Sequence, residues 1–328
     1  MFTKEQVITM IIVMLVLVPV QLVLMVVVHE TGHFIGGKTA GYRLTHIKMF
    51  NVYAERHEGK IRIVFRKGAF DPLGQCMMSG DEKLRPGRLI LGGCAANILV
   101  GAAAAVIMLV TPNLVVFGAS AVVATLNLVF GLSNLLSRSL SCDGAVYREV
   151  RGERVLETGY NRIMQISERL KGTDTFGTLE PELLGRMQSG STSGVSADLC
   201  YYGYLGKFEN ARAKDLNELK GLLGQLRRYS EDLTGDSVRT ENEILKKCRS
   251  RGTEKFDGNA VDDCLTGDPR EALSRLLDFD VQQDSEIKTV CDRIRAKARR
   301  EAYPGEWISA ANSFVAAIGI RREETKNI

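Results

Sequence analysis

The first apolar run of the chain leads directly into a histidine-containing motif. Residues 7–28 carry no charge and are interrupted only by Thr9, Pro19 and Gln21. As a helix that rises 1.5 Å per residue, a run of this length spans about 33 Å, enough to cross the hydrocarbon core of a bilayer. The motif that follows is therefore expected inside a membrane or at its edge.

The motif itself reads His-Glu-Thr-Gly-His over residues 29–33. On a helix, His29 and His33 share one face and can hold a single zinc ion, while Glu30 can act as general base toward a zinc-bound water. The alternative is a helix end with two interfacial histidines and no metal. Ionisable groups in a membrane helix are costly and usually functional, which favours the metal site.

Two further runs are free of Asp, Glu, Lys and Arg, residues 89–110 and 114–136. Each is long enough for a transmembrane helix, so the sequence predicts three spans, the first over residues 7–28. That first run is longer than the apolar part of a signal peptide, and no small-residue cleavage site follows it before the histidines.

From about residue 150 the composition becomes charged, and apolar residues recur at helical spacing. One such stripe is formed by five leucines: Leu216, Leu219, Leu222, Leu223 and Leu226. We therefore expect an α-helical membrane protein with a three-helix core in residues 1–149 and a mainly α-helical domain in residues 150–328.

Lysine and arginine are concentrated in the segment between the first two spans, residues 34–87, and are missing from the connection at residues 111–113. Because loops rich in these residues stay in the cytoplasm, this segment and the carboxy-terminal half are predicted to be cytoplasmic. We expect a multi-pass protein of the bacterial plasma membrane. The net charge of +4 gives no reason to expect a nucleic-acid partner.

The same basic segment contains two stretches rich in β-branched and aromatic residues, Tyr42 to Tyr53 and Ile61 to Phe65, separated by Glu58-Gly59. This pattern predicts a β-hairpin inserted between the first two spans. The alternative is a solvated loop whose basic residues contact anionic lipid headgroups.

A catalytic zinc site usually takes three protein ligands, so the two histidines of the motif need a third. The other histidines, His46 and His57, lie in the basic segment, which leaves a carboxylate as the other option. Asp143 follows the third span, and the predicted topology places it at the same membrane depth as the motif. A turn or helix cap before Gly144 is the alternative role for this residue.

The cysteines number seven, with no Cys-x-x-Cys pair. An odd number of scattered cysteines predicts reduced thiols and argues against a disulfide framework or a zinc ribbon. Cys142 adjoins Asp143, but its spacing matches no metal site, which favours a free structural thiol.

Three blocks of the sequence resemble the site-2 proteases, a family of intramembrane zinc metalloproteases. The motif at residues 29–33 is similar to the family's HExxH, and Gly92 to Asn97 resembles the small-residue and asparagine block of its second core helix. Asn134-Leu135-Leu136 followed by Asp143-Gly144 resembles the family's Asn-x-x-Pro…Asp-Gly motif. Ser137 stands where the family usually has proline, and the interval from Asn134 to Asp143 is about one residue longer.

The resemblance implies that His29, His33 and Asp143 bind Zn²⁺ and that Glu30 is the catalytic base. The implied reaction is hydrolysis of a peptide bond in a membrane-anchored protein or peptide near the cytoplasmic face, with the predicted hairpin presenting the substrate.

Asn134 and Asn97 are candidates for orienting the substrate backbone or stabilising an oxyanion, because an amide can donate a hydrogen bond. Their alternative role is to bridge helices. At the level of the whole protein, the alternative is a catalytically silent membrane scaffold whose helical domain binds a protein partner. Zinc content distinguishes the two hypotheses.

Overall fold

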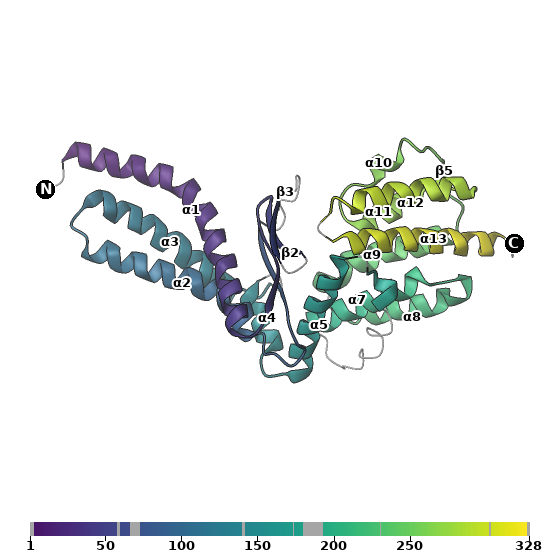
Figure 1. The fold of residues 1–328 in the computed structure, drawn as a ribbon, viewed down its shortest axis with the longest axis horizontal. Coiled ribbons are helices and arrows are strands. Elements are labelled where there is room, and N and C mark those ends of the chain that lie inside the picture. Colours follow the sequence, from purple (N-terminus) through teal and green to yellow (C-terminus); the bar gives the residue numbers. More distant parts are fainter. Residues whose placement is uncertain are drawn as a thin grey trace. The chain divides into compact units, whose positions relative to one another are not determined.

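The computed structural model describes residues 3–57, 60–65, 73–139, 142–172, 174–179, 193–229, 231–301 and 303–326 (Figure 1). The chain divides into two compact units, Met1–Met164 and Gln165–Ile328. The first unit contains the apolar helices and a small sheet, and the second is mainly helical.

Three helices of the first unit are long and apolar enough to cross a membrane: α1 (Lys4–Thr39), α2 (Gly87–Val110) and α3 (Leu114–Leu136). They lie where the sequence predicts the three spans. α1 is longer than the predicted span, because the helix continues through the motif and ends at Thr39. Gly41, just beyond this end, has a positive φ of 97°. Residues 29–33 are therefore helical, as the motif requires. Many apolar side chains of these helices are exposed, among them Leu15 and Leu109, as expected for surfaces that contact lipid.

α1 changes direction part way along its length (Figure 1). Pro19 lies inside the helix and has no N–H to donate to the preceding turn, which is the usual cause of such a bend. After the bend, α1 approaches α2 very closely. A Cβ on Gly92 would lie 2.3 Å from the carbonyl oxygen of Gly32, so the glycines let the two backbones meet.

The sheet inserted between α1 and α2 has four antiparallel strands in the order β3-β2-β1-β4. Its strands are β1 (Arg43–Met49), β2 (Val52–His57), β3 (Lys60–Phe65) and β4 (Gly74–Ser79). The prediction of a single hairpin was therefore wrong in extent. Phe50, with a φ of 55°, turns the stretch Tyr42 to Tyr53 back on itself, and β4 has no β-branched residue to reveal it.

Two helices follow the third span, α4 (Asp143–Val150) and α5 (Arg154–Leu170). Asn161 of α5 ties three segments together: it accepts a hydrogen bond of 2.6 Å from the Tyr42 hydroxyl and donates to the carbonyl oxygen of Leu84 at 2.8 Å. The first half of α5 is thereby anchored to the segments that precede β1 and α2.

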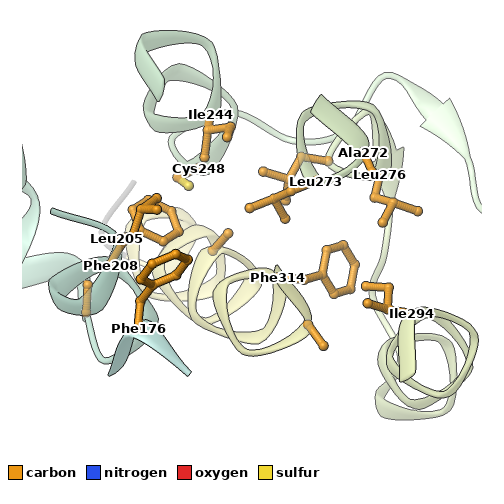
Figure 2. Packing of buried hydrophobic residues seen from close by; sticks show 14 of the residues in the cluster. Phe176, Leu205, Phe208, Ile244, Cys248, Ala272, Leu273, Leu276, Ile294 and Phe314 are labelled. Atoms are coloured by element: carbon orange, nitrogen blue, oxygen red, sulfur yellow. The ribbon is translucent and has the colours of Figure 1, made fainter. Parts of the chain in front are cut away.

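The second unit is built from helices around one hydrophobic core (Figure 2). Its elements are α7 (Gly194–Glu209), η1 (Ala213–Asp215), α8 (Leu216–Leu226), α9 (Glu231–Cys248), α10 (Val261–Cys264), α11 (Pro269–Leu276), α12 (Asp284–Ala298), α13 (Pro304–Lys326) and the short parallel strands β5 (Glu254–Lys255) and β6 (Phe279–Asp280).

Two helices of this unit agree with the sequence pattern. The predicted leucine stripe is α8, whose Leu216, Leu219, Leu223 and Leu226 are buried. α13 buries Phe314 completely against residues such as Leu273 and Ile294 (Figure 2). The cysteines are also as predicted, because all seven are free thiols.

Candidate metal centre

The two histidines of α1 point their Nε2 atoms at one another, 3.1 Å apart, and both rings are buried. The Nδ1 atom of His33 lies 2.7 Å from the carbonyl oxygen of Leu89 on α2. A carbonyl oxygen can only accept, so the ring carries its proton on Nδ1 and keeps a lone pair on Nε2. His33 is therefore held in the form that a metal ligand needs.

Asp143 joins this pair from the first turn of α4. Its Oδ2 atom lies 3.0 Å from Nε2 of His29 and 3.3 Å from Nε2 of His33. The structure thus brings together the three residues that the sequence analysis proposed as ligands. Within the described part of the chain, they form the group whose ligand atoms are close enough to share one metal ion.

The spacing of the three atoms fits a zinc ion. Ligands at about 2.0–2.1 Å from zinc in tetrahedral geometry lie about 3.3 Å apart, close to the separations observed here. Two neutral imidazoles and one carboxylate are also a typical catalytic donor set. Burial raises the pKa of Asp143, but the adjacent imidazole groups of His29 and His33 outweigh it and hold the pKa well below its ordinary value. The ligand is therefore ionised near neutral pH.

Glu30 lies beside the three residues and is buried, with 5 % of its surface exposed. It forms a hydrogen bond with the backbone of Cys76 on β4, and a Cβ on Gly74 would lie 2.5 Å from its Oε1 atom. Its Oε2 atom has no hydrogen-bond partner among the described residues. One carboxylate oxygen is held in place while the other stays free, an arrangement suited to a general base.

Asn134 and Asn97 have different surroundings. The amide of Asn134 donates to Oδ2 of Asp143 at 3.1 Å and lies 3.3 Å from Nε2 of His29, while its Oδ1 accepts from the Asp143 backbone at 3.0 Å. Asn97 is fully buried one turn beyond Gly93, and its side-chain amide has no partner among the described residues. Asn134 is thus part of the cluster, whereas Asn97 does not line the site.

A cavity of about 650 Å³ surrounds the cluster. It is lined by α1, α2, α3 and α4, and by residues not expected from the sequence: Gly74, Gln75 and Cys76 of β4, and Tyr160 of α5. No pattern in the sequence marks them, because their approach depends on how the strand and helix pack.

Three residues around the cluster, Cys94, Cys76 and Tyr160, have physical features of their own. The Sγ atom of Cys94, not that of Cys142, donates to Oδ2 of Asp143 at 3.4 Å. Burial and, to a lesser extent, the charge of Glu30 raise the pKa of Cys76 to about 12, so this thiol stays neutral. Burial likewise raises the pKa of Tyr160 above its ordinary value, and its hydroxyl remains a hydrogen-bond donor.

The family model of peptidase family M50 matches residues 17–292. The match covers most of the chain, which belongs to this family of membrane metalloproteases, the site-2 protease family, for which zinc is typical. The match also extends far into the second unit, beyond the three blocks at residues 7–150. Comparison with curated proteins and with solved structures gives no match.

Proposed function

We propose that the protein is an intramembrane zinc metalloprotease that hydrolyses a peptide bond of a membrane-anchored protein or peptide near the cytoplasmic face. The observation that supports this most directly is the convergence of His29, His33 and Asp143 next to the free carboxylate oxygen of Glu30. His29, His33 and Asp143 would hold the zinc ion. Membership in a metalloprotease family supports the reaction class.

When bound at this site, zinc would supply a Lewis acid able to lower the pKa of water and polarise a carbonyl group. Glu30 takes the proton from the attacking water and returns it to the leaving nitrogen. Asn134 holds Asp143 and is fully engaged in doing so, which leaves Tyr160 as the better candidate for a donor to the developing oxyanion.

The substrate is proposed to lie along β4. In the sheet order β3-β2-β1-β4, this strand pairs with β1 alone among the described strands, and its Gly74 and Cys76 line the cavity. A strand edge can hold an extended peptide by main-chain hydrogen bonds. β4, which lies outside the predicted hairpin of Tyr42 to Tyr53 and Ile61 to Phe65, is therefore the strand that we propose beside the substrate.

The charge distribution supports a location in the bacterial plasma membrane with several spans, the basic segment and the carboxy terminus being cytoplasmic. The second unit would then face the cytoplasm, where we propose that it binds a protein partner or the soluble part of the substrate.

Substitution of Glu30 by Gln tests the proposed function. The change keeps the shape of the side chain but removes the base, so we expect cleavage to fall by about 10²–10⁴-fold. The measurement is quantitative proteomics of membranes that contain the wild-type protein or Glu30→Gln. A membrane-anchored substrate should accumulate at full length with the variant, and its shorter product should disappear.

Metal analysis of the purified proteins completes this test. Wild type and Glu30→Gln should both contain about one zinc per chain, because Glu30 is not among the three converging ligands. Removal of the metal with a chelator should abolish cleavage, and added zinc should restore it. A wild-type protein without zinc, or full cleavage by Glu30→Gln, would contradict the proposal and favour a silent scaffold.

A further inference from the structure

A second cavity of about 890 Å³ lies between α1 and α2 and shares no lining residue with the candidate metal centre. Its floor is made of small residues from both helices: Gly32, Gly36, Gly92, Ala95 and Ala96. The exposed side chains of Ile35 and Leu99 form part of its walls. The cavity is thus an apolar groove on the surface of two membrane helices, and we call it the α1–α2 groove.

One end of the α1–α2 groove is strongly basic. Arg85 and Arg88 line it at the start of α2, beside Tyr147 of α4. A smaller cavity of about 410 Å³ continues from this end, shares Arg85 and Tyr147 with the groove, and adds Arg151 and Arg154. Arginine side chains therefore collect where the apolar surface meets the polar boundary of the membrane.

Most of this positive charge is not neutralised by the protein. Arg154 forms an ion pair of 3.1 Å with Glu157. Among the described residues, no carboxylate lies within ion-pair distance of Arg85, Arg88 or Arg151. The guanidinium group of Arg151 lies over the ring of Tyr147, 5.7 Å from its centre, which holds it beside the opening.

An apolar groove that ends in unpaired arginines matches a molecule with an apolar tail and an anionic head. Guanidinium groups bind phosphate oxygens through paired hydrogen bonds, and basic pockets beside membrane helices bind anionic headgroups. A second copy of this chain fits poorly, because a two-fold contact across the groove would bring its arginines against one another.

We propose that the α1–α2 groove is a binding site for an anionic phospholipid. The phosphate lies against Arg85 and Arg88, with Arg151 beside it, and an acyl chain lies on the floor of small residues between α1 and α2. This site is separate from the candidate metal centre, so its occupancy does not depend on zinc or on the proposed peptidase activity.

Native mass spectrometry of the full chain in detergent tests the proposal, with phosphatidylglycerol and phosphatidylcholine carrying the same acyl chains. We expect phosphatidylglycerol to be retained about tenfold more strongly than phosphatidylcholine. Arg85→Gln together with Arg88→Gln should remove this preference. The matched control, Arg43→Gln together with Arg138→Gln, replaces two exposed arginines that line neither cavity. This control should keep the preference for phosphatidylglycerol.

The tail of the lipid is tested separately. Ala95→Trp fills the groove without changing its charge, and it should also reduce the bound phosphatidylglycerol several-fold. Soluble glycerol 3-phosphate in excess should not displace the lipid, because it lacks the acyl chains. The proposal would be overturned if the protein bound the two lipids equally, or if the control variant lost the preference for phosphatidylglycerol as well. It would also be overturned if Ala95→Trp bound phosphatidylglycerol as the wild type does, or if a protein dimer were found in place of the lipid complex. Circular dichroism verifies that every variant is folded.

Discussion

Gly93 faces the two histidine rings from α2. A Cβ at this position would lie 2.5 Å from Nε2 of His33 and 2.7 Å from Nε2 of His29. Real side chains do not tolerate contacts this short, so even a methyl group would have to displace the rings. The absence of a side chain at residue 93 is therefore as important for the cluster as the presence of the histidines.

Gly93→Ala is expected to remove most of the bound zinc and most of the cleavage activity. On helix propensity alone, the change would stabilise a helix by about 1 kcal/mol, so a loss of zinc would come from the steric contact. The measurement is zinc content by metal analysis together with cleavage of a substrate found in the proteomic comparison.

The matched control is Gly221→Ala on α8, where a Cβ would meet no atom within 4 Å. It should keep zinc and activity and leave stability equal or slightly higher. If Gly93→Ala behaves like this control, the proposed arrangement of the two histidines around a metal is wrong.

At the scale of elements, the junction between α3 and α4 delivers the carboxylate. Asn134 pairs with both the side chain and the backbone of Asp143, and Gly144 packs directly on the carbonyl oxygen of Leu135. Arg148 donates to the carbonyl oxygens of Leu135 and Ser137 at the end of α3. The start of α4 is thus fastened to the last turn of the third span.

This junction explains why the missing proline matters little. Ser137 has a φ of −55° and a ψ of 147°, a conformation that proline itself favours after a helix. The longer interval before Asp143 is accommodated because Asn134 reaches the first residue of α4 directly. The departures from the family pattern therefore leave the carboxylate beside the histidines.

Asn134→Ala should loosen this junction. Asp143 would lose two hydrogen bonds, and groups that orient metal ligands typically contribute 10–100-fold to metal affinity or activity. We expect zinc affinity, measured by competition with a chelator, to fall by about this factor.

Ser133→Ala, on the exposed face of the same turn, serves as control and should leave zinc affinity unchanged. A variant Asn134→Ala with wild-type zinc affinity would show that the asparagine bridges helices without supporting the metal.

At the scale of the whole molecule, the second unit contains a buried ion pair at its centre. Arg270 of α11 donates two hydrogen bonds, of 2.7 and 2.6 Å, to the carboxylate of Glu241 on α9, which is fully buried. Tyr201 of α7 donates to the same carboxylate at 3.0 Å. Three helices are therefore linked through one charged group.

Glu241→Gln is expected to destabilise the second unit strongly. The change removes one charge and leaves the buried guanidinium group of Arg270 unpaired, which typically costs about 3–5 kcal/mol. Thermal unfolding of the purified protein, followed by circular dichroism, measures the effect.

Glu243→Gln is the control, because Glu243 is exposed on the same helix and its replacement should change stability by no more than about 0.5 kcal/mol. Equal unfolding temperatures for the two variants would mean that the ion pair does not stabilise this unit.

The sequence alone determined the features that depend on neighbouring residues. The three spans follow from the length of uncharged apolar runs, and the shared face of His29 and His33 follows from the helical period. Asp143 was also within reach of sequence reasoning, because two crossings separate it from the motif, and an even number of crossings returns the chain to the same membrane depth. The leucine stripe of α8 is likewise a local periodic pattern.

Only the tertiary structure decided which distant segments surround these residues. β4 has no β-branched alternation, yet its Gly74 and Cys76 lie against Glu30. Cys94, Gly93 and Tyr160 reach the cluster through helix packing, and Asn97 is turned away from it although it belongs to a family-like block. The physical reason is that local patterns specify the faces of helices, whereas close packing between helices and strands selects which of those faces meet.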